Sequence, residues 1–100
     1  MAKKVYISAP ITGIDTETVD RVFTEKETLL SGQGYEVINP MRLQESLTGE
    51  PTYGQYMGLD IEHLIDRADT VYFCKGWKKS KGCMLEFHAA IIYSKKIILE

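Results

Sequence analysis

Short apolar segments alternate with helix-length segments along all 100 residues, and this alternation is the feature that most limits the possible folds. The apolar segments are rich in residues that favour strands, and they lie at positions 5–7, 35–38, 70–74 and 97–99. Between them, apolar residues recur every three or four positions, as in amphipathic helices, at positions 16–32, 57–68 and 81–94. Strands that are separated by helices are joined by crossovers, so this order predicts a parallel sheet.

The predicted strands are apolar throughout, which is typical of strands that are covered on both faces. We therefore expect one small α/β domain over residues 1–100, because a chain of this length is enough for one domain and not for two. Its parallel sheet should have four strands, or five, with helices on both faces, as in Rossmann-like and flavodoxin-like proteins. Asp15 or Thr16 can cap the first helix, and Gly32 can end it. Residues 41–56 show no clear period, and such a long loop in a small domain is usually functional or mobile.

The composition argues against several functional classes. The formal charge is −2, with 12 basic and 14 acidic residues, so no overall positive field is available to bind a nucleic-acid duplex. No apolar run approaches the roughly 20 residues of a membrane helix, and the N-terminal residues lack the apolar segment of a signal peptide. We expect a cytoplasmic protein without a membrane partner. Cys74 and Cys83 should be free, buried thiols, and with His63 and His88 they match no common zinc pattern, so no metal or other cofactor is expected.

Three polar side chains occupy apolar surroundings in the predicted elements. Glu86 is the only acid between residues 83 and 93, and helical spacing places it on the same face as Gly82 and other small residues. Asp60 flanks the apolar side of its helix, and Tyr6 lies in a strand that should be central. Each has a simpler interpretation: a solvated glutamate on an outer helix face, an acid in a first helical turn, and a core aromatic residue.

In open α/β sheets, ligands bind beyond the carboxyl ends of the strands. This rule selects four segments: residues 8–13, the loop that follows Asn39 and Pro40, the turn at residues 75–82, and whatever lies past Leu99. The turn holds four lysines, and Ser80 within it can cap the apolar helix that follows. A helix N-terminus with a hydroxyl and nearby cations suits an anion, although a solvated basic turn is the simpler interpretation. Trp77, in the same turn, could stack on a base or cover the edge of the sheet.

With these residues in view, the chain resembles the nucleoside 2-deoxyribosyltransferase superfamily. Its likeness extends to the small phage and bacterial members of that group and to the deoxynucleoside 5'-monophosphate N-glycosidases. Three motifs carry the resemblance: Val5-Tyr6-Ile7-Ser8 continuing into Ile11-Thr12-Gly13, Leu59-Asp60-Ile61, and Ser80-x-Gly82-x-x-x-Glu86. They are similar to the family's opening strand and sugar-binding loop, its acidic residue, and its serine, glycine and nucleophilic glutamate. Each motif alone is weak, but the ordered set spans most of the chain.

The resemblance implies a covalent mechanism at a sugar. Glu86 would attack C1', Asp60 would position or protonate groups around the sugar and the base, and Tyr6 would contact the reaction centre. Ser80 would help to hold the 5' end, which is a phosphate in the monophosphate enzymes. These residue types suit the chemistry because breaking an N-glycosidic bond builds positive charge on the sugar ring, and a carboxylate stabilises that charge or forms a glycosyl ester.

The predicted catalytic residues are therefore Glu86, Asp60 and Tyr6, and the predicted substrate-binding residues are Ser8, Ile11, Gly13, Asn39, Trp77, Ser80 and Gly82. The sequence departs from the family where Ala9 and Pro10 replace glycines of the first loop, which would reshape the sugar pocket. Family members commonly complete the site with a neighbouring subunit, so we expect a homodimer or a larger homo-oligomer.

The expected activity is cleavage of the N-glycosidic bond of a deoxynucleoside or its 5'-monophosphate, with the sugar passed to water or to another base. One alternative is a nucleotide-binding or sensing module without turnover. Another is a structural protein that keeps only the fold.

Overall fold

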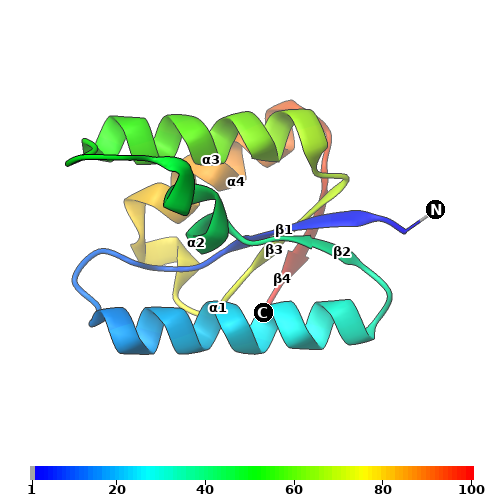
Figure 1. The fold of residues 1–100 in the computed structure, drawn as a ribbon. Coiled ribbons are helices and arrows are strands. Elements are labelled where there is room, and N and C mark those ends of the chain that lie inside the picture. The colour runs from blue at the N-terminus through cyan, green and yellow to red at the C-terminus, as the bar shows by residue number, and fades with distance from the viewer. Residues whose placement is uncertain (1) are drawn as a thin grey trace.

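A parallel sheet forms the middle layer of the molecule in the computed structural model, which describes residues 2–100 (Figure 1). Its strands are β1 (Lys4–Ser8), β2 (Glu36–Ile38), β3 (Thr70–Phe73) and β4 (Lys96–Leu99). They lie in the order β2-β1-β3-β4, and every neighbouring pair is parallel. This flavodoxin-like arrangement confirms the predicted fold class, with the smaller of the two expected numbers of strands. It makes β1 and β3 the central strands.

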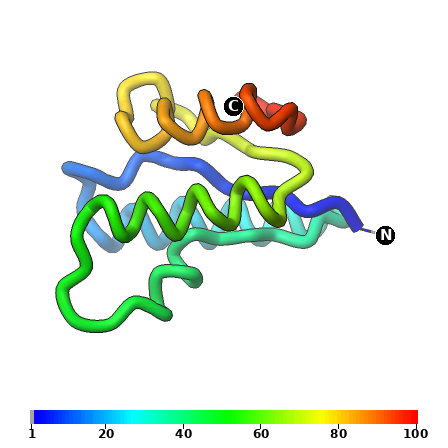
Figure 2. Tube along the Cα trace, turned by 90° about the horizontal axis from the view of Figure 1, so that it is seen from above, coloured from blue at the N-terminus to red at the C-terminus, as the bar shows by residue number. Residues whose placement is uncertain are grey.

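Helices cover both faces of the sheet, as predicted. α1 (Thr16–Gly32) packs on one face, and α3 (Tyr53–Arg67) and α4 (Lys81–Ile92) lie on the other (Figure 1). Figure 2 looks down on the side of α3 and α4, with α1 behind the sheet. The core is accordingly divided into two clusters, one between the sheet and α1 and one between the sheet and the other two helices.

Side chains of β1 alternate between these two clusters, because successive residues of a strand point to opposite faces. Val5 and Ile7 pack in the cluster that contains the α1 residue Phe23. Tyr6 packs in the cluster that contains residues of α3 and α4. Two residues further along, Ser8 has the same orientation as Tyr6, so both hydroxyl groups face the layer of α3 and α4.

Two of the predicted helix caps are confirmed. Asp15 caps α1, where its Oδ2 accepts a hydrogen bond of 3.0 Å from the backbone N–H of Thr18. Ser80 caps α4, where its Oγ accepts a bond of 3.2 Å from the backbone N–H of Cys83. α4 ends at Ile92, slightly earlier than the periodicity predicts. Each cap satisfies a backbone donor that the first helical turn leaves without a partner.

The segment predicted to be an irregular loop, residues 41–56, contains more structure than its periodicity indicates. It holds most of a short helix, α2 (Pro40–Leu43), and a 3-10 turn at Gln44–Ser46, and α3 already begins at Tyr53 rather than at position 57. The early start has a local cause, because Thr52 and Gln55 form a capping box. A cap of this kind depends on polar residues, so apolar periodicity does not reveal it.

Two further expectations concern thiols and membranes. Cys74 and Cys83 are buried and free, as predicted. Over residues 2–100, none of the helices combines the length and the apolar character that crossing a bilayer requires.

Candidate active site

A buried carboxyl group, that of Glu86, lies where the carboxyl end of β1 meets α4. Only 5% of Glu86 is exposed. The hydroxyl of Tyr6 donates a hydrogen bond to its Oε2, and Ser8 Oγ donates a bond of 2.7 Å to its Oε1. Both donors come from the same face of β1, so the strand holds both oxygens of one carboxyl group at once.

Burial and hydrogen bonding act on the Glu86 carboxyl group in opposite directions. The net effect raises its pKa from 4.5 to about 7, chiefly through desolvation, with a smaller upward contribution from the nearby charge of Asp60. The hydrogen bonds from Tyr6 and Ser8 lower the pKa, because they stabilise the carboxylate. The pKa of Tyr6 itself lies well above 10, owing first to its burial and then to the charge of Glu86, so this hydroxyl keeps its proton and remains a donor. Near neutral pH, Glu86 can therefore exchange a proton or act as a nucleophile.

A second buried carboxyl group, that of Asp60, reaches the same region from α3. Asp60 is 4% exposed, and its Oδ2 accepts a hydrogen bond of 3.2 Å from Gln44 Nε2. Its Oδ1 is buried and has no hydrogen-bond partner within residues 2–100. Burial raises its pKa from 3.8 to about 6, against the smaller effect of the bond from Gln44. A buried polar atom without a partner is unusual and points to a group that binds there.

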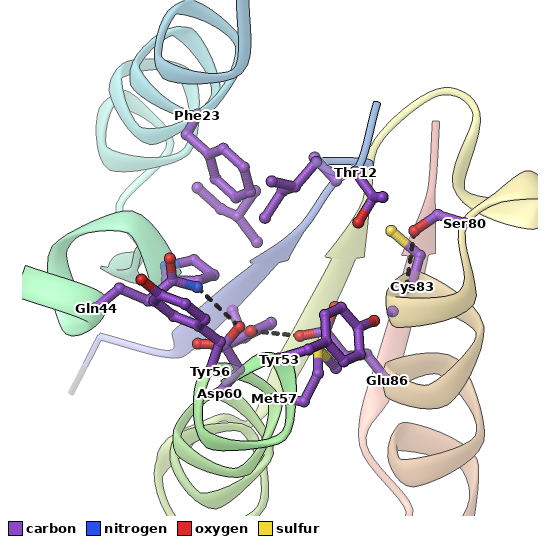
Figure 3. A pocket seen from close by; sticks show the side chains of 16 residues that line it. Thr12, Phe23, Gln44, Tyr53, Tyr56, Met57, Asp60, Ser80, Cys83 and Glu86 are labelled. Carbon is purple, nitrogen blue, oxygen red and sulfur yellow. Dashed lines mark hydrogen bonds between the residues drawn. The ribbon is translucent and has the colours of Figure 1, made fainter. Parts of the chain in front are cut away.

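The two carboxyl groups border one cavity of about 230 Å³ (Figure 3). Most of its walls are apolar or aromatic, and its lining residues are Tyr6, Ile7, Ala9, Ile11, Thr12, Phe23, Pro40, Gln44, Tyr53, Tyr56, Met57, Asp60, Ser80, Gly82, Cys83 and Glu86. An apolar hollow with a few convergent polar groups of perturbed pKa is the usual form of a small-molecule site. It also lies at the edge of the sheet where ligands bind in this fold class.

Most of the predicted site residues line this cavity or contact Glu86, namely Tyr6, Ser8, Ile11, Asp60, Ser80, Gly82 and Glu86. The remaining predicted residues have other surroundings. Asn39 is buried and caps α2 by accepting a bond of 3.0 Å from the backbone N–H of Met41. Trp77 stacks on Phe87 in the core, with 4.6 Å between the ring centres. Gly13 is in the loop after β1, in a left-handed conformation (φ 81°), and is not among the lining residues.

The basic turn lies beside the cavity and borders a second hollow of about 520 Å³. The two hollows share four lining residues: Thr12, Tyr53, Ser80 and Gly82. Lys79 and Lys81 line only the second hollow, and among residues 2–100 neither forms a salt bridge. An anionic group that extends from the cavity toward Ser80 would therefore meet positive charge.

Sequence reasoning missed several residues of the cavity walls, above all Gln44, Tyr53 and Tyr56. One available signal was the segment 41–56 itself, whose lack of periodicity and length indicated a functional or mobile loop. Its aromatic residues are three positions apart, which places them on one side of a helix once the helix is known to begin at Tyr53. The Thr52-x-x-Gln55 spacing, which is typical of a helix N-terminus, is the sequence signal that could have revealed this start.

No group of three or more His, Cys, Asp or Glu side chains in the described part of the chain is arranged to hold a metal ion. A comparison with protein families finds one whose sequence model matches residues 3–99, described as "Domain of unknown function (DUF4406)". A search of curated proteins finds no match.

Proposed function

The chain belongs to the DUF4406 family, and we propose that it cleaves the N-glycosidic bond of a 2'-deoxynucleoside or of its 5'-monophosphate, with Glu86 as the nucleophile. The observation that carries the proposal is the buried Glu86 carboxyl group, held by two hydroxyls of β1 at a cavity that a second carboxyl group also borders. The resemblance to the nucleoside 2-deoxyribosyltransferase superfamily supports the same assignment of residues.

The reaction needs two carboxyl groups with different tasks. An oxygen of Glu86 attacks C1' of the sugar while the bond from C1' to the base nitrogen breaks, and the electron pair of that bond leaves with the base. Asp60 in its protonated form donates a proton to the departing base. Water, or a second base, then attacks C1' and breaks the glycosyl ester, giving its proton to the Asp60 carboxylate and restoring Glu86.

The hydroxyl groups of Tyr6 and Ser8 have a positioning task in this scheme. They bind separate oxygens of Glu86, which fixes the plane of the carboxyl group. A nucleophile held in one orientation loses little freedom when it reacts, and this is a general source of rate enhancement.

The two pKa values give the proposal a narrow pH range. Glu86 must be ionised to attack, and its ionised fraction grows as the pH rises through about 7. Asp60 must be protonated to donate a proton to the base, and its protonated fraction falls as the pH rises through about 6. The reactive combination is therefore a minor population that is largest between these values, and kcat/KM should peak there and fall on both sides. A profile that rises steadily from about pH 5 to about pH 8 would contradict the paired roles.

The direct test is to incubate the protein with each deoxynucleoside and each 5'-monophosphate and to measure free base by chromatography. We expect base release, with a preference for monophosphates if the second hollow binds the phosphate near Lys79 and Lys81. Glu86→Gln should lower kcat/KM by at least about 10³-fold, as the loss of a nucleophile does in other enzymes. Glu62→Gln, at an exposed position of α3, is the matched control and should keep full activity.

Two outcomes of this experiment contradict the proposed activity. Base release that survives in Glu86→Gln, or the absence of base release from any substrate with folded protein, refutes the proposal. If nucleotides raise the melting temperature without base release, the cavity binds without turnover, which is the alternative that the replaced glycines at Ala9 and Pro10 favour. The expected homodimer or larger homo-oligomer also stays a prediction, which sedimentation measures.

A further inference from the structure

We infer that Tyr53 closes the mouth of the Glu86 cavity, and that Gly82 provides the space into which the Tyr53 hydroxyl fits. Tyr53 stands in the first turn of α3, and its ring reaches across toward the start of α4 (Figure 3). It lines both the cavity and the neighbouring second hollow, and it is 57% exposed. Tyr53 is therefore at the boundary between the cavity, the second hollow and the solvent.

The absence of a side chain at Gly82 permits this crossing. A Cβ atom at Gly82 would lie 3.1 Å from the hydroxyl oxygen of Tyr53 and 3.5 Å from the sulfur of Met57. The first distance is tighter than an ordinary van der Waals contact. Gly82 is not among the glycines of positive φ, so its backbone conformation is open to other residues. The close approach of Tyr53, rather than the backbone, is what calls for glycine here.

The Tyr53 side chain is largely exposed, and its close approach to Gly82 is what places its hydroxyl. Over residues 2–100, its hydroxyl makes no hydrogen bond, whereas the buried Tyr6 hydroxyl is bound to Glu86. An exposed side chain without a hydrogen bond changes rotamer on the picosecond to nanosecond timescale. The ring can thus swing aside to admit a ligand and return over it.

The position of Tyr53 also has a consequence for specificity, and this consequence rests on the proposed function. A ligand group that joins a sugar beside Glu86 to an anion beside Lys79 must pass where the two hollows meet, a boundary lined by Thr12, Tyr53, Ser80 and Gly82. Tyr53 then limits the size of the group at the 5' position. Tyr53→Ala should relax the preference among nucleosides that differ in that group, mainly through KM.

The first test needs no ligand and no catalysis. Cys83 lines the cavity and is 1% exposed, whereas Cys74 is 2% exposed and packs in the other core cluster, next to α1. Both thiols are labelled with methyl methanethiosulfonate at one fixed pH, and the rate at each is followed by peptide mass spectrometry. Tyr53→Ala should raise the rate at Cys83 by about tenfold, through easier local opening, and leave the rate at Cys74 unchanged. Tyr53→Phe keeps the ring and should leave both rates unchanged.

A second set of variants tests the role of Gly82. Gly82→Ala should fold well, because alanine is favoured over glycine within a helix. Its methyl group should displace the Tyr53 hydroxyl and raise labelling at Cys83 by less than Tyr53→Ala does. Adding Tyr53→Phe removes the crowded oxygen and should return labelling to the rate of Tyr53→Phe alone.

Two results would overturn the inference: an unchanged labelling rate at Cys83 in Tyr53→Ala, or an equal rise at Cys83 and Cys74. The equal rise would mean that Tyr53 stabilises the whole fold instead of closing the cavity. Because labelling proceeds without substrate, a protein that releases no base yet shows selective labelling of Cys83 refutes the proposed function and leaves the closure by Tyr53 standing.

Discussion

The raised pKa of Glu86 predicts that this residue destabilises the folded protein at neutral pH. Its pKa is about 7 in the folded state and near 4.5 in an unfolded chain, so the folded protein binds the proton more tightly. The contribution of Glu86 to the free energy of unfolding is therefore most favourable below about pH 4.5, where Glu86 is protonated in both states. This contribution is lost as the pH rises through about 7. Because one pKa unit corresponds to about 1.36 kcal/mol, the loss amounts to about 3 kcal/mol. This is a large part of the total stability of a small domain, roughly 5–15 kcal/mol.

Glu86→Gln removes the titration and keeps the shape of the protonated side chain. We expect the variant to become more stable than the wild-type protein as the pH rises, with a difference that grows by about 3 kcal/mol between about pH 4.5 and about pH 8. Urea unfolding at a series of pH values, followed by the fluorescence of the buried Trp77, measures the free energy of unfolding of both proteins. Asp60 also titrates in this range, but it is present in both proteins, and most of its contribution cancels.

Glu62→Gln is the control, since Glu62 is exposed on α3 and its substitution should change stability by the same small amount at every pH. A difference between the wild-type protein and Glu86→Gln that stays constant from acid to alkaline pH would refute the reasoning. It would mean that the Tyr6 and Ser8 hydroxyls stabilise the carboxylate enough to offset its burial, so that its pKa is ordinary.

Three further predictions concern neighbouring residues. Ser8→Ala removes a hydrogen bond that lowers the pKa of Glu86, so in the profile of kcat/KM against pH the bend near pH 7 should move to higher pH. A bend that stays at the same pH would contradict this role of Ser8. Gln44→Ala removes the donor to Asp60, so the pKa of Asp60, measured by carboxyl NMR titration, should rise above about 6, and a fall would be inconsistent with the bond. Thr52→Ala deletes the cap of α3 and should lower the free energy of unfolding by about 1 kcal/mol in urea; no loss would mean that the capping box contributes little.

The fold could be predicted from the sequence because the strands are apolar runs and the helices have a clear period. Both patterns follow directly from burial on a sheet that is covered on both faces. Glu86 could also be identified as a candidate site residue, because an acidic side chain within an apolar helix is unusual whatever that helix packs against. The start of α3 does not show in apolar periodicity; its signal in the sequence is the Thr52-x-x-Gln55 spacing, which is typical of a helix N-terminus.

Trp77 illustrates a second limit of sequence reasoning. Its neighbours in the chain are lysines and glycine, which indicate an exposed turn, but a 3-10 turn at Trp77–Lys79 directs the ring inward onto Phe73 and Phe87. The partners of a tertiary contact are distant in sequence, so a local pattern contains no information about them. The same holds for Gln44, whose bond to Asp60 joins two elements that no local sequence pattern connects.

The alternation of side chains along β1 has a consequence for how the site can change over generations. Tyr6 and Ser8 share a face only because they are two positions apart, so inserting or deleting one residue ahead of them would exchange them for the aliphatic neighbours and turn both hydroxyls toward α1. Gain or loss of one whole codon in this strand would thus displace both hydroxyls together, whereas point substitutions can tune each hydroxyl separately. Length variation among descendants of this chain should accordingly be found in its loops and be strongly selected against in β1.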